Sequence, residues 1–166
     1  RIAASFACSS GKGGATPWRR YCGETVENIA ASGEYHWMAG NFIKYASDPY
    51  SAADMPVDQH ELLALCAPRL LLVSSGVPEA DKWQDLIGMH LSASLASPVY
   101  DLVCDGGLRY GYAGNIDEGM RTDIFPGVNV GLMGGRLAFR VHDGGHEPGP
   151  NWPYFLDLFD LYVVKK

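Results

Sequence analysis

The sequence has no long hydrophobic run and no concentration of positive charge. No apolar stretch approaches the roughly 20 residues that a membrane-spanning helix needs, and the first residues lack the pattern of a signal peptide. Lys and Arg number 13 against 19 Asp and Glu, which gives a net charge of -6. This balance argues against binding to nucleic acid or to an anionic membrane surface.

The cysteines are few and far apart. No two of them form a C-x-x-C pair, which disfavours a zinc site or a dithiol redox motif, although one or two disulfides remain open. The four are Cys8, Cys22, Cys66 and Cys104. Cys66 lies in an apolar run and is expected to be a buried thiol. His60 and Glu61 also fail to make a zinc motif, because no second histidine follows four residues after His60.

The chain carries enough apolar material for one core. It has 166 residues, of which 47% are hydrophobic, and this fits a single domain. It begins at Arg1 rather than Met, so we expect a processed product or a fragment.

Hydrophobic patterning predicts alternating strands and helices. Apolar runs at 2–7, 70–75 and 137–141 predict buried strands, and helical spacing is expected at 25–31, from Asp58 to Pro68, at 81–95 and at 152–164. Trp37, Phe42 and Tyr45 mark a further amphipathic stretch, and Glu61 stands at capping-box spacing from Asp58. The glycine-rich stretch at about 104–135 predicts a long loop or a small hairpin insert.

The resulting order predicts an α/β fold in which helices cover a parallel sheet. A sheet of three strands leaves both of its edges unpaired. We therefore interpret 1–166 as part of a larger domain, similar to the second half of a doubly wound sheet.

The end of the chain carries the clearest functional signal. The expected strand at 137–141 breaks at Gly144 and Gly145, His146 follows, and a helix comes next. Strand, glycine turn, imidazole and helix are the parts with which an α/β-hydrolase presents its general base. His146 is therefore the candidate base, and His142, four residues earlier, is expected to be structural.

A nucleophile is harder to place. Ser9 follows a strand in the order Ala7-Cys8-Ser9-Ser10-Gly11, a variant of the Gly-x-Ser-x-Gly elbow. An elbow serine opens a long helix, however, and Pro17 prevents a helix there. The Gly-Lys pair in this loop also lacks the Ser or Thr of a phosphate-binding motif. Ser9 thus remains a minor candidate.

A series of short segments shows a family resemblance over nearly the whole chain except about 104–135. In order, they are Trp18-Arg19-Arg20, Gly23-Glu24-Thr25-Val26-Glu27-Asn28-Ile29, His36-Trp37-Met38, Met55-Pro56-Val57-Asp58-Gln59-His60-Glu61-Leu62, Ala67-Pro68-Arg69, Asp81-Lys82-Trp83 and Gly144-Gly145-His146. Together they resemble the carboxy-terminal half of glucuronoyl esterases, which form carbohydrate esterase family 15. The resemblance is strongest to the bacterial branch of this family.

The resemblance implies a three-layer α/β-hydrolase that cleaves the ester between glucuronic acid, often 4-O-methylated, on xylan and an alcohol of lignin. Such enzymes use a Ser-His-acid mechanism and no metal or other cofactor. Their nucleophile elbow precedes the segment present here, so the partner expected for this chain is the amino-terminal half of the same domain. The resemblance also implies a secreted or periplasmic protein.

The resemblance also assigns roles to residues of this chain. The acid falls on Asp81 in the Asp-x-Trp pattern, with Glu79 as an alternative. Some members carry a glutamate where this chain has Ser9, which leaves the role to Asp81. Glu24 and Trp83 match positions that hold the sugar, and Trp37 is expected in the same cleft.

Two other functions remain open. The chain could come from another acyl esterase or peptidase of the superfamily, or from a carbohydrate-binding remnant without catalysis. Activity on uronate methyl esters compared with acetyl or peptidyl substrates would separate the first alternative, and binding of glucuronoxylan fragments without hydrolysis would favour the second.

Overall fold

The computed structural model describes residues 2–77, 82–112, 115–117 and 120–165. Its strands form one six-stranded sheet in the order β1-β2-β6-β5-β3-β4. The strands are β1 (Ala4–Cys8), β2 (Leu70–Ser75), β3 (Gly111–Tyr112), β4 (Asn115–Ile116), β5 (Gly131–Met133) and β6 (Leu137–Val141). The three longest are the three that the apolar runs predict. The prediction of only three strands is wrong, because β3, β4 and β5 extend the sheet beyond β6.

Four α-helices accompany the sheet in the described parts of the chain: α1 (Val26–Ile29), α2 (Gln59–Ala64), α4 (Leu86–Cys104) and α5 (Trp152–Phe159). Short 3₁₀ turns lie at Tyr35–Trp37, Gly40–Ala46, Ala52–Asp54, Lys82–Gln84 and Gly149–Asn151, and a π-helical turn at Asp160–Val164 continues α5. The stretch marked by Trp37, Phe42 and Tyr45 is therefore built of 3₁₀ turns and not of one amphipathic α-helix.

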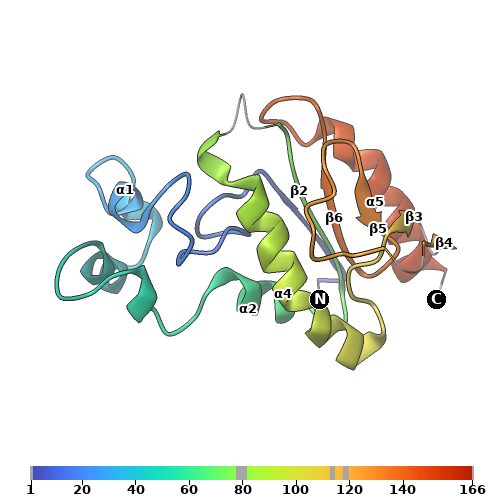
Figure 1. The fold of residues 1–166 in the computed structure, drawn as a ribbon, viewed down its shortest axis with the longest axis horizontal. Coiled ribbons are helices and arrows are strands. Elements are labelled where there is room, and N and C mark those ends of the chain that lie inside the picture. The colour runs from blue at the N-terminus through green and yellow to red at the C-terminus, as the bar shows by residue number, and fades with distance from the viewer. Residues whose placement is uncertain (1, 78–81, 113–114, 118–119, 166) are drawn as a thin grey trace.

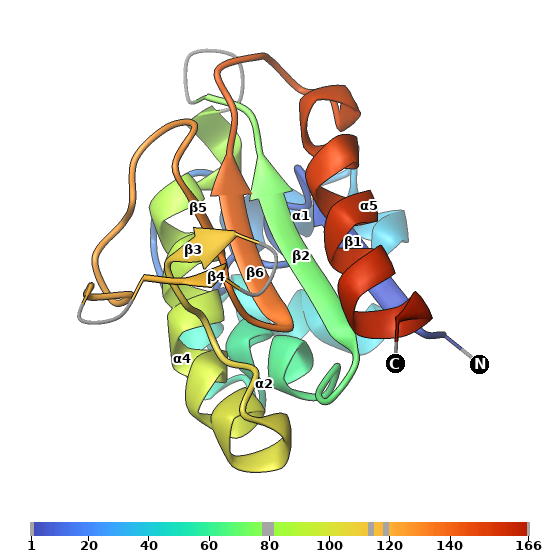
Figure 2. The same ribbon diagram turned by 90° about the vertical axis from the view of Figure 1, so that its right-hand side faces the viewer.

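The parallel strands fix the layers. β1 pairs with β2, and β2 with β6, all in parallel. Side chains alternate between the two faces of a strand, so Leu71 and Val73 face α4 while Leu70 and Leu72 face α5. Figure 2 shows α4 and α5 on opposite sides of the sheet. The predicted three-layer arrangement is confirmed for this part of the fold.

The helix after β2 starts later and runs further than the sequence predicts. Asp85, at φ 53°, caps it by accepting from the Gly88 N–H at 3.0 Å. The helix then continues to Cys104, with Pro98 inside it. Its buried side, which includes Met89 and Tyr100, packs on the sheet. The free energy gained by this burial offsets the loss of the backbone hydrogen bond that Pro98 cannot make.

Residues that surround α1 form a lobe at one side of the sheet (Figure 1). The lobe has its own small core of Trp18, Val26, Ile29 and Met55. Thr25 caps α1, and Asp58 caps α2 through the predicted capping box with Glu61. The loops and turns of this lobe supply one wall of the candidate site.

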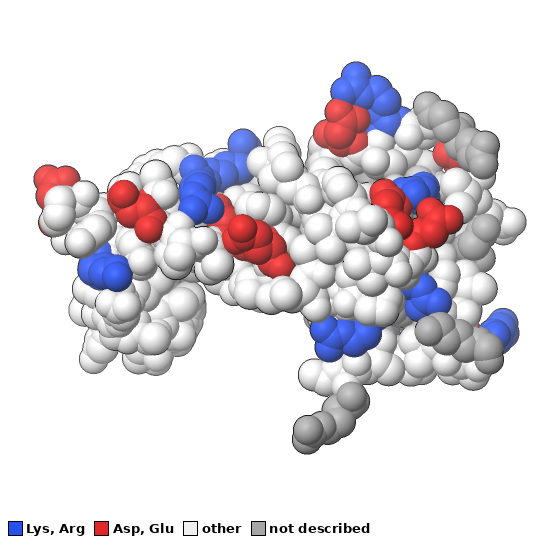
Figure 3. Space-filling view, turned by 90° about the horizontal axis from the view of Figure 1, so that it is seen from below, with Lys and Arg blue, Asp and Glu red and all other residues white. Residues whose placement is uncertain are grey.

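Two apolar features of the surface remain uncovered. β1 is an end strand of the sheet and is only half-buried, whereas β2 and β6 are fully buried. One side of α4 is exposed along its length, at Ile87, Leu91, Leu95, Val99 and Leu102. Elsewhere, on the face shown in Figure 3, basic and acidic side chains are interspersed in small groups. No described helix is long and apolar enough to cross a membrane.

Candidate active site

An open cleft of about 960 Å³ lies between the lobe and the start of the 3₁₀ turn at Lys82–Gln84. Its lining includes three of the residues that the sequence singles out, Glu24, Trp37 and Trp83. Lys12 and Glu34 line it as well. The cleft thus combines carboxylates, an ammonium group and two indole rings, which suits a polar ligand with an apolar face.

Two glycines allow the cleft wall to form. Gly11 has φ 49°, and a Cβ there would lie 2.9 Å from Trp83 Cζ3 and 3.2 Å from Glu24 Oε2. Gly23 has φ 70°, and a Cβ there would lie 2.2 Å from the Trp83 carbonyl oxygen. Only glycine adopts such a backbone at so close an approach without strain. The adjacent Glu24 N–H donates to that carbonyl at 3.0 Å, which ties the two sugar-site candidates together.

The ionisable groups of the cleft influence one another. Burial raises the pKa of Glu24, and the negative charge of Glu34 raises it further, while the backbone N–H and the charge of Lys12 oppose this. Burial lowers the pKa of Lys12, against the opposing effect of Asp85 and Asp58. The Lys12 ammonium donates to the carbonyls of Pro17 and Arg20.

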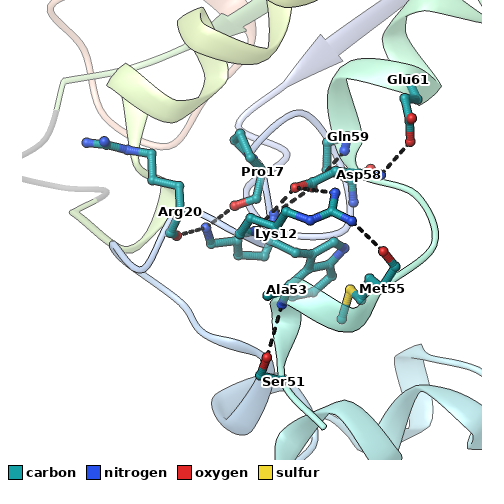
Figure 4. A network of polar contacts seen from close by, with 11 residues as sticks. Lys12, Pro17, Arg20, Ser51, Ala53, Met55, Asp58, Gln59 and Glu61 are labelled. Carbon is teal, nitrogen blue, oxygen red and sulfur yellow. Dashed lines mark hydrogen bonds and ion pairs between the residues drawn. The ribbon is translucent and has the colours of Figure 1, made fainter.

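The loop that carries Lys12 is anchored by a buried carboxylate. Asp58 accepts from the Trp18 N–H at 2.7 Å and from the Gln59 N–H at 2.8 Å, and it pairs with the Arg19 guanidinium at 3.4 Å (Figure 4). Arg19 also donates to the Met55 carbonyl. This network holds the lobe against α2.

Both arginines beside Trp18 bond within the protein. Arg20 Nε donates to Asp85 at 2.7 Å, and Arg19 pairs with Asp58. Both guanidinium groups are thus engaged by carboxylates of the chain itself.

His146 lies at the edge of this cleft. Its ring centroid is 5.5 Å from the ring centroid of Trp83, and Trp83 also lines the cleft. Its Nδ1 lies 3.0 Å from the side-chain amide of Gln84. A small cavity of about 110 Å³, lined by Cys8, Ser9, His146, Glu147 and Pro148, adjoins it.

The loop that presents His146 is fixed by a second histidine. His142 is fully buried, its Nδ1 accepts from the Gly144 N–H at 2.9 Å, and its Nε2 donates to the Glu147 carbonyl at 2.9 Å. A Cβ on Gly76 would lie 2.2 Å from the Gly145 carbonyl, so the end of β2 and this loop are in close contact. The structural role predicted for His142 is confirmed.

The structure gives different outcomes for the candidate acid, the candidate serine and the cysteines. Asp81 and Glu79 lie outside the described residues, so the choice of acid stays a prediction. Ser9 has φ 48° and is followed by bends and turns, without the helix that an elbow needs. All four cysteines are free thiols, so no disulfide joins any two of them. No group of three or more described His, Cys, Asp or Glu side chains is placed to hold a metal ion.

Gln84 is the site residue that sequence reasoning missed. It is fully buried, and its side chain joins Ser75 at the end of β2 to His146. Its only sequence signal was its place next to Trp83.

Comparison with known proteins decides the family. The family model for fungal glucuronyl esterase matches residues 1–104. The chain belongs to the glucuronoyl esterase family, carbohydrate esterase family 15. The carbohydrate esterase MZ0003, from an unknown prokaryotic organism, is 42% identical over 165 residues, which are 99% of this chain and 34% of that protein.

Solved structures of this family agree. A glucuronoyl esterase from Teredinibacter turnerae is 49% identical with a TM-score of 0.80, over 95% of this chain and 34% of that one. A promiscuous esterase of the same family from a marine bacterial metagenome is 31% identical with a TM-score of 0.79, over 98% of this chain and 36% of that one.

This glucuronoyl esterase family member therefore spans about a third of the length of those relatives. It corresponds to their carboxy-terminal third, and the prediction of a carboxy-terminal half overestimates its share.

Proposed function

We propose that this chain is the acid-and-base part of a glucuronoyl esterase that hydrolyses esters between (4-O-methyl-)glucuronic acid on xylan and lignin alcohols. Its family membership supports this proposal. The observation that carries it is the position of Trp83, which lines the cleft and also contacts the ring of His146. A sugar bound in that cleft has its reacting carbonyl within reach of the imidazole.

The cleft residues suit a uronate ring. The Glu24 carboxylate can accept hydrogen bonds from two ring hydroxyls, and the exposed face of Trp83 can stack on the apolar face of the sugar. Trp37 is 61% exposed, and we assign it to the same ligand, further along the cleft.

The reaction would be a two-step acyl transfer. A serine on a segment outside these 166 residues attacks the uronate carbonyl carbon, and His146 takes its proton. The acid, for which we propose Asp81, stabilises the resulting imidazolium. The lignin alcohol leaves with the proton from His146. A water molecule then gives its proton to His146 and hydrolyses the acyl-enzyme, which releases the uronic acid and returns the serine.

The nucleophile segment has a natural place beside β1. β1 is an end strand of the sheet and is only half-buried. Parallel strands are normally buried, and an open strand edge invites pairing with another strand. We propose that the nucleophile strand of the larger domain pairs there. We also propose that the enzyme is secreted or periplasmic, because a cell-wall polymer does not enter a cell.

The test uses the natural polypeptide that contains this chain. Purified protein is assayed on the methyl ester of glucuronic acid, on an acetyl ester and on a peptide substrate, with His146→Ala as the control. We expect hydrolysis of the uronate ester that His146→Ala abolishes.

Each other outcome contradicts this proposal in a distinct way. Activity on acetyl or peptidyl substrates alone indicates a different acyl hydrolase of the superfamily. Binding of glucuronoxylan fragments without hydrolysis indicates a carbohydrate-binding remnant. Hydrolysis by a polypeptide that carries no upstream serine elbow contradicts the proposed triad and makes Ser9 a candidate nucleophile again.

A further inference from the structure

The outer face of α4 has no exposed polar side chain, although the structure describes every residue of this helix. Seven of its residues are exposed, and all of them are apolar: Ile87, Leu91, Leu95, Pro98, Val99, Leu102 and Val103. They recur three or four residues apart, so they form one continuous stripe along the helix. A helix that faces water normally turns charged or polar side chains outward. The stripe therefore has the composition of a packed surface.

The other sides of α4 are covered within this chain. Met89 and Tyr100 pack in the core on the sheet, and α2 lies alongside the helix. The loop at Thr122 contacts α4 through His90, whose Nε2 donates to the Thr122 carbonyl at 2.9 Å. Figure 1 shows no helix or strand in front of α4. Among the described elements, none covers the stripe.

The composition of the stripe argues against a membrane surface and against a charged partner. Helices that lie on a membrane combine an apolar face with Lys and Arg on the polar face, and α4 contains neither. A charged partner would meet no opposite charge on the stripe, because the one Asp of the helix, Asp101, is not among its exposed residues. The stripe thus suits an apolar partner.

The size of the stripe argues against a second copy of this chain as that partner. A helix of 19 residues is about 28 Å long, and at a width of about 10 Å its outer face covers about 300 Å². A standard interface between two proteins buries about 800 Å² on each partner. The stripe therefore fits one packed segment and is too small for a stable dimer.

The relatives of this chain have a large region that can supply such a segment. They are about three times as long as this chain, which corresponds to their carboxy-terminal third. We propose that an apolar segment of the amino-terminal part of the same polypeptide packs along the stripe and buries α4 in the complete domain. This contact is separate from the strand pairing beside β1, because α4 connects β2 and β6, further into the sheet. It does not depend on the hydrolysis of any ester.

The first test is photo-crosslinking within the natural polypeptide. The photoreactive amino acid p-benzoylphenylalanine replaces Leu95, which is 51% exposed, and mass spectrometry identifies the peptide that it captures. Leu91 is the second position if the Leu95 variant does not fold. We expect a product of monomer mass in which the captured peptide precedes residue 1.

The matched control for this test lies on α5. Leu156 is 54% exposed, close to the value of Leu95, but its neighbours Asp157 and Asp160 are exposed carboxylates, so this face is one that meets water. The same crosslinker at Leu156 should capture no peptide from the amino-terminal part.

The second test is thermal unfolding of the natural polypeptide. Leu and Gln have similar helix propensities, so Leu95→Gln changes little in a helix face that stays in water. Under an apolar segment, the same change loses apolar contact and buries an amide without a partner, and it should lower the unfolding temperature by about 3 °C or more. Leu156→Gln should leave the unfolding temperature within about 1 °C of the wild-type value.

Three results would overturn the proposal. Capture of a second copy of the polypeptide makes the stripe a dimer interface. Capture of no peptide from Leu95 and Leu91 leaves the stripe in water. An unfolding temperature that Leu95→Gln changes no more than Leu156→Gln leads to the same conclusion. All three results are independent of whether the polypeptide hydrolyses glucuronoyl esters.

Discussion

Replacement of Asp58 by alanine should loosen the attachment of the lobe to α2. The side chain is 3% exposed and accepts from three different backbone or side-chain donors of the loop, besides capping α2. Loss of the cap costs about 1 kcal/mol. A buried Trp18 N–H without a partner costs about 1–3 kcal/mol. The pair with Arg19, whose side chain is 40% exposed, adds less than about 1 kcal/mol.

Together these effects should lower the free energy of unfolding by about 3 kcal/mol. With a urea m-value of about 2 kcal/mol/M, the unfolding midpoint should fall by about 1.5 M. The matched control is Asp54→Ala, which removes the carboxylate of a similar but exposed capping box at Ser51. This control should cost less than about 1 kcal/mol. If Asp58→Ala costs no more than Asp54→Ala, the buried carboxylate is not the anchor of the lobe.

Three further substitutions test the cleft. Gly11→Ala places a Cβ against Trp83 where the backbone is left-handed, so it should lower the free energy of unfolding by about 1–2 kcal/mol. Urea unfolding followed by tryptophan fluorescence measures this loss, and an unchanged midpoint contradicts it. Glu24→Gln should stabilise the protein at pH 7, because burial and Glu34 raise the pKa of Glu24 and its ionisation disfavours the folded state. The gain should vanish below a pH of about 4, where the carboxyl is protonated in both states; urea unfolding at the two pH values checks it, and an equal gain at both refutes it. His146→Ala should lower kcat of the natural polypeptide by about 10⁴-fold or more with KM little changed, in steady-state assays, and retention of activity excludes His146 as the base.

The sequence predicted the elements whose stability is local or strongly apolar. The run at 70–75 is fully buried as β2, and the strand at 137–141 is β6. The capping box at Asp58 and Glu61 also formed as expected, because its partners are three residues apart.

Elements that depend on distant contacts could not be predicted in this way. β3 and β4 have two residues each, too few for any periodicity, and they exist because they pair with neighbours in the sheet. The helix boundary at Leu86 depends on the left-handed backbone of Asp85, which its side chain alone does not reveal. Gln84 carries no motif, and its contacts appear only when β2 and the loop that presents His146 are brought together.

The position of β6 has a consequence for biosynthesis. This strand lies between β2 and β5 in the sheet, yet it is the last of the described strands along the sequence. β2 therefore gains its neighbour β6 only after residues 137–141 are made, since pairings between distant segments form late. A ribosome product that stops before residue 137 lacks the centre of the sheet, not its margin. Premature termination should thus yield a chain for degradation.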